Sequence, residues 1–248
     1  MAQVIAFEDR QSDAAGVERI WRSRSDRGGP FVSIAASCFE MAITRHRGRT
    51  SITLRGPETR ATPADCPPDG EWLGIRFAPG TFMPALTPGE VRDRRDATLP
   101  DASARAFWLD GSAWAYPDFD NADTFVARLF RRGLLVHDPV VGAALRGDVE
   151  ARSIRTAQRH VLRATGLTVG AITRIERARH ATLLLRAGVP ILDVVDTAGY
   201  YDQAHLTRSL THRIGQTPRQ IAAGTGQLSF LYKTTPPRRG YDAGGDLT

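Results

Sequence analysis

The chain has 248 residues and a net charge of +6, and its hydrophobic (42%) and charged (24%) fractions are ordinary for a folded protein. Such a chain can bury a sizeable core, and we expect two domains. It contains no apolar run near the roughly 20 residues of a membrane span, and its first residues lack a signal-peptide pattern. Two widely separated cysteines, Cys38 and Cys66, fit a reduced cytoplasmic protein better than a disulfide framework. We therefore expect a cytoplasmic protein without a membrane partner.

The positive charge is unevenly distributed along the chain. Residues 1–136 hold 18 arginines and 18 acidic residues, whereas residues 137–224 hold 12 arginines and 7 acidic residues. A neutral first half and a basic second half suggest that the second half meets a polyanion.

The first half reads as a β-rich domain, expected at residues 1–120. Short apolar segments alternate with turns that are rich in Gly, Pro and Asp, which favours a barrel or a sandwich. We predict a short helix near Ala14 to Arg22, followed by strands at Phe31–Glu40, Met41–His46, Ser51–Arg55 and Trp72–Phe77.

No catalytic residue, metal site or cofactor is predicted in this domain. His46 has no His-x-His or Glu cluster around it, and the sequence shows no nucleophile elbow or phosphate-binding loop. Aromatic side chains can line a small-molecule pocket in such a barrel, although filling the core is their commoner role. The pocket candidates are Trp72, Phe77 and Trp108.

The second half reads as helical, with helices at residues 121–132 and 139–145 and a third that Ser153 can cap. The third helix carries Arg155, Gln158 and Arg159 on one face, opposite an apolar stripe. These residue types read bases and phosphates. A solvated charged face is the alternative interpretation.

An amphipathic helix is predicted next, over residues 169–187, with a length of roughly 27 Å. Successive major grooves on one face of DNA lie about 34–36 Å apart. A helix of this length, with the offsets of the units at its ends, permits two reading helices to reach adjacent grooves.

A helix-turn-helix pattern follows at residues 186–221. Pro190 opens the first helix, Gly199 supplies a turn that needs a positive φ, and Asp202 can cap the second helix. Leu206, Leu210 and Ile214 form the buried stripe of that second helix, Gly215 ends it, and Thr217-Pro218 begins a last short helix. Hydrogen-bonding side chains cover its opposite face, among them Gln203, His205, Thr207 and Arg208.

The run GVPILDVVDTAGYYDQAHLTRSLTHRIGQTP resembles the signature of AraC/XylS-type transcriptional regulators, through A-G-Y-x-D-x-x-H-L-x-R and G-x-T-P. The segment S-x-R-T-x-Q-R, followed by T-G, resembles the first helix-turn-helix of the same module, although the loop RGDVEAR before it departs from the usual tight turn. The first half is similar to the cupin-like sensor domains of the family through GIRFAPGTFMPAL and a following D-x-x-x-x-L-P.

The resemblance implies an α+β chain, in which a β-rich cupin-like barrel precedes an all-α DNA-binding domain at residues 121–224 with two helix-turn-helix units joined by a linker helix. It implies a non-enzymatic transcription factor that binds double-stranded DNA. The residues expected to contact DNA are Arg155, Gln158, Arg159, Gln203, His205, Thr207 and Arg208. A small-molecule effector, RNA polymerase and a second copy of the chain are the further partners that the family analogy allows.

Two alternatives stay open at this point, namely a small-molecule-binding or catalytic barrel that carries the helical domain, and a protein-interaction module. Residues 225–248 read as a flexible tail; packing of the apolar LSFLY segment onto a domain, or its pairing with a strand, is the alternative.

Overall fold

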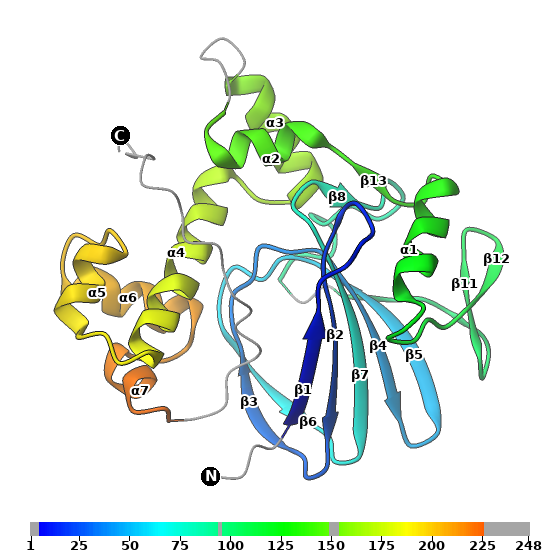
Figure 1. Ribbon diagram of the computed structural model, residues 1–248, viewed down its shortest axis with the longest axis horizontal. Helices are drawn as coiled ribbons and strands as arrows, with labels where there is room; N and C mark the ends of the chain where they lie inside the picture. The colour runs from blue at the N-terminus through cyan, green and yellow to red at the C-terminus, as the bar shows by residue number, and fades with distance from the viewer. Residues whose placement is uncertain (1–4, 94–95, 149–153, 226–248) are drawn as a thin grey trace.

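The computed structural model describes residues 5–93, 96–148 and 154–225. Its first part is built from antiparallel strands, of which six form one sheet in the order β1-β2-β7-β4-β5-β9 (Figure 1). These strands are β1 (Ile5–Arg10), β2 (Val17–Ser25), β4 (Glu40–His46), β5 (Arg49–Arg55), β7 (Gly70–Phe77) and β9 (Ala97–Thr98). Smaller sheets pair β3 (Gly29–Ser33) with β6 (Thr62–Cys66), β8 (Thr81–Phe82) with β13 (Val136–His137), and β11 (Ala106–Leu109) with both β10 (Asp101–Ser103) and β12 (Ser112–Ala115).

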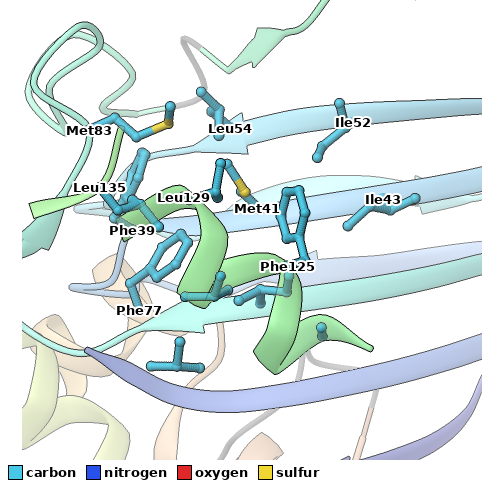
Figure 2. Packing of buried hydrophobic residues seen from close by; sticks show 14 of the residues in the cluster. Phe39, Met41, Ile43, Ile52, Leu54, Phe77, Met83, Phe125, Leu129 and Leu135 are labelled. Atoms are coloured by element: carbon cyan, nitrogen blue, oxygen red, sulfur yellow. The ribbon is translucent and has the colours of Figure 1, made fainter. Parts of the chain in front are cut away.

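One face of the six-stranded sheet is apolar and carries the main core. Because side chains alternate across a strand, Met41 and Ile43 of β4 lie on the same side as Leu73 and Ile75 of β7, and all four are buried. Helix α1 (Ala122–Arg131) covers this face, and Figure 2 shows its Phe125 over the sheet. The predicted boundary at residue 121 stays a prediction, but α1 packs into the core of the strands that precede it.

The opposite face of the sheet is polar and aromatic. Trp21 on β2, Glu40 on β4, and Trp72 and Arg76 on β7 line a cavity on this side. A Cβ atom at Gly74 would lie 2.0 Å from the Trp21 ring, so the glycine lets that indole lie across the sheet. The β3–β6 pair supplies further walls of the cavity. These sheets make the amino-terminal region β-rich, as predicted, while the cupin-like barrel stays a prediction.

Two sequence-based predictions in this region were wrong. Residues 17–22, part of the expected helix near Ala14 to Arg22, lie in strand β2, which pairs with β1 on one side and β7 on the other. Buried and exposed positions alternate from Trp21 to Ser25, while Ile20 and Trp21 are both buried because each face of the sheet is covered at this point. Two long strand partners outweigh the local helical pattern.

The expected strand at Phe31–Glu40 is interrupted after Ser33. The backbone of Ala35 instead bonds to the helical region: its N–H donates to the carbonyl of Arg213 (2.7 Å), and its carbonyl accepts from Arg179 (3.1 Å). Tertiary hydrogen bonds therefore replace those of a strand in this segment.

The remaining part of the described chain is helical, as predicted. Its helices are α2 (Pro139–Arg146), α3 (Ile154–Thr165), α4 (Val169–Arg186), α5 (Ile191–Thr197), α6 (Gln203–Arg213) and α7 (Pro218–Ala222). They surround two apolar clusters, and each cluster includes a residue from the segment after β3: Ala35 in one and Ile34 in the other. The helical region therefore packs against the β-rich region beside β3 (Figure 1). No described helix is long and apolar enough to cross a membrane, and the predicted tail from residue 226 onward lies outside the described residues.

Candidate nucleic-acid interface

The first helical unit consists of α2 and α3, packed through buried Val141, Ala157 and Val161. Asp138 caps α2 by accepting a hydrogen bond from the Val140 N–H, and its other carboxylate oxygen lies 2.6 Å from Nδ1 of His160 on α3. The Asp138 carboxylate therefore caps α2 and, through His160, also bonds α2 to α3. The predicted cap Ser153 lies outside the described residues, as does most of the loop RGDVEAR.

Helix α3 presents a continuous exposed face. Arg155, Gln158 and Arg159 are all exposed, and Leu162 and Arg163 extend the same face at i+7 and i+8 from Arg155. Leu162 is 49% exposed among these polar groups. Sequence reasoning selected three of the five residues and missed the last two, although helical periodicity alone places them on this face.

The second unit consists of α5 and α6, with a tight turn between them. Gly199 has φ +70°, as predicted, and the Asp202 carboxylate accepts from the His205 N–H at 2.6 Å as the cap of α6. Tyr200 is buried in the turn, where its hydroxyl lies 3.1 Å from Ser209 Oγ. Pro190 precedes α5 as its N-cap residue instead of standing in the first turn.

The outer face of α6 divides into free and engaged side chains. Gln203 and Arg208 are exposed. His205 is half-buried and stands edge-on to the Tyr200 ring, and the Thr207 hydroxyl donates to the carbonyl of Gln203 at 2.8 Å. Thr211, eight residues after Gln203, is also exposed. Around the helix axis it lies between Gln203 and Arg208 on the same face. It was not among the expected contact residues.

Helix α4 joins the two units, and its buried residues divide between them. Ile172 and Ile175, near its start, belong to the apolar cluster of the first unit, whereas Ala178, Ala181 and Leu185 belong to that of the second. The Thr168 hydroxyl caps the helix by accepting from the Ala171 N–H. Its 18 residues match the predicted linker, and one rigid element thereby fixes both units.

The second unit closes on a short helix, and its end is also well defined. Gly215 has φ +78°, and Thr217 with Gln220 forms a capping box at the start of α7. The end of α6 at Gly215 and the start of α7 after Thr217 agree with the sequence-based prediction, whereas the part of Gln220 in the capping box was not predicted. The second unit is held at each of its turns by a specific glycine or cap.

The charges on the two outer faces are available to a ligand. Among the described residues, Arg155, Arg159 and Arg208 form no ion pair with a carboxylate. A further group of cations lies where α4 meets α6: burial lowers the pKa of Arg213, and the nearby charges of Arg174 and Arg177 lower it further. Clustered cations of this kind repel one another and favour a polyanionic partner.

The three predicted pocket residues occupy three different environments. Trp72 lines the cavity beneath the six-stranded sheet. Phe77 lies in the apolar core on the other face, stacked on Phe39, and Trp108 is 46% exposed on β11, away from the cavity. Phe77 and Trp108 therefore do not line it. Within the described ranges, no three His, Cys, Asp or Glu side chains are grouped to hold a metal ion.

Comparison with known proteins places the helical units in a family. Residues 148–224, less than half of the chain, match a family model described as "Helix-turn-helix domain". No curated protein sequence matches the chain. A solved structure of ToxT from Vibrio cholerae aligns with 89% of this chain and 98% of that one, at 6% sequence identity and a TM-score of 0.39. The match agrees with the geometry: residues 148–224, which include α3 to α7, contain an AraC-type helix-turn-helix domain.

Proposed function

We propose that the protein regulates transcription by binding an operator through both helical units at once, with α3 and α6 in adjacent major grooves. The observation that carries this proposal is the division of α4: its first half is buried in one unit and its second half in the other. At about 1.5 Å per residue, α4 spans roughly 27 Å. With the offsets of α3 and α6, this length suits grooves about 34–36 Å apart.

The side chains on the outer faces have the chemistry that this role needs. The guanidinium groups of Arg155, Arg159 and Arg208 can each bind O6 and N7 of a guanine, and Gln158 and Gln203 can each bind adenine. Leu162 offers an apolar contact for a thymine methyl group. His205 and Thr207 are engaged within the protein, so we assign them supporting contacts to sugar or phosphate.

We also propose that the β-rich region acts as a sensor for a small molecule, with the cavity beneath the six-stranded sheet as its binding site. Burial raises the pKa of the Cys38 thiol in the cavity wall to about 11. This thiol is therefore protonated near neutral pH and a weak nucleophile, which supports binding instead of catalysis. RNA polymerase and a second copy of the chain are the protein partners that a regulator of this kind would use.

The test uses the full chain, because α1 belongs to the core of the β-rich region. Fluorescence anisotropy of labelled DNA from upstream of the gene would be followed during a salt titration, with scrambled DNA as competitor. We expect saturable binding that resists the scrambled competitor and weakens steeply with salt as phosphate contacts are lost. Salt-insensitive association would favour a protein-interaction role. Equal binding to both DNAs would contradict operator recognition on this segment.

A further inference from the structure

Two arginines meet where α4 passes the start of α6. The Arg177 guanidinium donates from Nη1 to the Gly199 carbonyl (3.1 Å) and lies over the Tyr200 ring, 5.7 Å from its centroid. Arg213 of α6 reaches the same tyrosine from the other side: its Nη1 lies 3.4 Å from Ser209 Oγ, which is 3.1 Å from the Tyr200 hydroxyl. Both charges therefore lie beside the turn that precedes the reading helix of the second unit.

A third arginine, Arg174, extends this group along α4 toward the first unit. It precedes Arg177 by three residues, a spacing that makes neighbours on a helix surface. Its Nη1 lies over Gly170, where a Cβ atom would be 3.5 Å away, and both residues are exposed. Burial lowers the pKa of Arg213, and the charges of Arg174 and Arg177 lower it further. Arg174, Arg177 and Arg213 thus form one arginine cluster.

The charge of the arginine cluster is not offset within the described part of the chain, where no carboxylate forms an ion pair with it. The single acidic residue of α4, Glu176, is engaged elsewhere: it accepts a hydrogen bond from Ser37 of the β-rich region (2.6 Å) and lies 3.9 Å from Arg179. A donor is also left over, since Nε of Arg213 is buried without a hydrogen-bond partner in the same described residues. Converging cations with spare donors favour an anionic partner.

The place of the cluster on α4 indicates which anion it meets. Ile175 is buried in the first unit and Ala178 in the second, so Arg174 and Arg177 lie where one unit gives way to the other. Adjacent major grooves on one face of DNA are separated by a minor groove. The phosphates of that minor groove must pass between two helices that occupy the major grooves. The middle of α4 lies between α3 and α6 (Figure 1), so its arginines are placed to meet these phosphates.

We propose that Arg174, Arg177 and Arg213 form a phosphate-binding site that holds the DNA backbone across the minor groove between the two reading helices. Guanidinium groups suit this role, because each offers two parallel N–H donors to phosphate oxygens. Such a contact adds affinity without sequence preference and fixes the register of α4 on the duplex. The inference rests on the proposed function for the placement of α3 and α6, whereas binding of the cluster to a phosphate can be tested on any duplex.

The substitution Arg174→Gln tests the site on the full chain, because Arg174 is exposed and its loss should leave the fold intact. Fluorescence anisotropy would follow two labelled duplexes, the bound operator DNA and a scrambled version, at several salt concentrations. We expect binding of both duplexes to weaken about tenfold, as for a hydrogen bond between charged groups. The slope of log affinity against log salt should become shallower by about 1. Arg174→Lys keeps the charge and should restore most of the affinity.

The matched control is Arg186→Gln. Arg186 is exposed on the same helix, but it follows Arg177 by nine residues and therefore lies on the opposite side of the helix. This variant should keep the affinity and the salt slope of the parent protein on both duplexes. Circular dichroism establishes that each variant is folded.

The position of the bound phosphate is tested with modified DNA, so that the parent protein itself reports it. Single phosphates of the operator are replaced by uncharged methylphosphonates, one position at a time, across the segment between the two bound elements. We expect a short run of neighbouring positions at which the parent protein loses about tenfold in affinity. At these positions Arg174→Gln should lose nothing further, because the same contact is already absent.

Unchanged binding of both duplexes by Arg174→Gln would overturn the phosphate site, and an acidic protein surface would then be the better partner for the cluster. A loss confined to the operator would also overturn it, because that result indicates a base contact. The same holds if no methylphosphonate position distinguishes the parent protein from the variant.

Failure of the proposed function gives a different result. A parent protein that binds both duplexes equally, together with the expected loss in Arg174→Gln, would count against operator recognition alone and leave the phosphate site in place. Absence of binding to either duplex at low salt would overturn both.

Discussion

The two helix-turn-helix units differ in the chemistry of their outer faces. Helix α3 of the first unit presents three arginines, Arg155, Arg159 and Arg163, around Gln158 and the exposed Leu162. Helix α6 of the second unit presents one arginine, Arg208, among small or uncharged groups such as Gln203 and Thr211. Phosphate contacts give affinity that depends on salt, whereas base contacts give specificity. We therefore expect α3 to supply more of the salt-dependent affinity, in addition to its base contacts, and α6 to act mainly through base readout.

Their internal support differs as well. The second unit is fixed by a turn glycine, a buried turn tyrosine and an aspartate cap, and the end of α6 bonds to the β-rich region. The first unit relies on the Asp138 carboxylate, shared between the start of α2 and His160 on α3. A specificity-reading helix benefits from being held in one orientation, because base contacts tolerate little misplacement.

The largest effect is expected from the charged face of α3. The double substitution Arg155→Ala and Arg159→Ala should weaken operator binding by at most about 6 kcal/mol, because each bidentate arginine is worth about 1–3 kcal/mol and neighbouring side chains are not strictly additive. The slope of log affinity against log salt should also become shallower, because two positive charges are lost from the DNA interface. Anisotropy at several salt concentrations measures both quantities. An unchanged affinity together with an unchanged slope would contradict the assignment of DNA binding to this face.

A smaller effect is expected at α6. Arg208→Ala should cost about 1–3 kcal/mol in operator binding but leave binding to scrambled DNA nearly unchanged, because base readout is lost. Arg131→Ala, which removes an exposed arginine on α1 in the β-rich core region, is the matched control. Equal losses on operator and scrambled DNA would assign Arg208 to phosphate, and the contrast between the two units would then fail.

The cap of α6 offers a test of its support. Asp202→Ala should lower the free energy of unfolding by about 0.5–2 kcal/mol, because the His205 N–H loses its acceptor. Urea denaturation followed by circular dichroism measures this loss. A variant as stable as the parent protein would show that the turn is held without the cap.

The smallest effect is expected at Thr207. Its hydroxyl already donates to the Gln203 carbonyl, so Thr207→Val, which keeps the shape of the side chain, should change operator affinity by less than about 0.5 kcal/mol. Fluorescence anisotropy of labelled operator DNA measures this change. A loss of more than about 1 kcal/mol in binding free energy would show that the hydroxyl contacts DNA directly.

The helical region was largely predictable from sequence because its signals are local. The turn glycine Gly199, the cap Asp202 and the Thr217–Gln220 capping box act within a few residues of chain, and the structure contains all three. The exposed Leu162 and Thr211 follow from the same helical periodicity, so their omission was avoidable.

The β-rich region was less predictable because its structure depends on long-range pairing. Strand β2 owes its conformation to β1 and β7, and β7 lies about fifty residues further along the chain. Trp72 and Phe77 stand an odd number of positions apart in one strand, so they point to opposite faces, one to the cavity and one to the core. Neither Trp108 on its separate small sheet nor Arg179 in the cavity wall could be placed without knowing how the elements pack.

The central claim is that both units read DNA together, and selection of bound sequences from a random double-stranded library by the full chain tests it most directly. The account predicts a motif of two elements whose centres lie about 10–10.5 base pairs apart, one helical turn. The Arg155→Ala and Arg159→Ala variant should lose one element and keep the other. A single uninterrupted element, selected equally by the parent protein and that variant, would contradict the account.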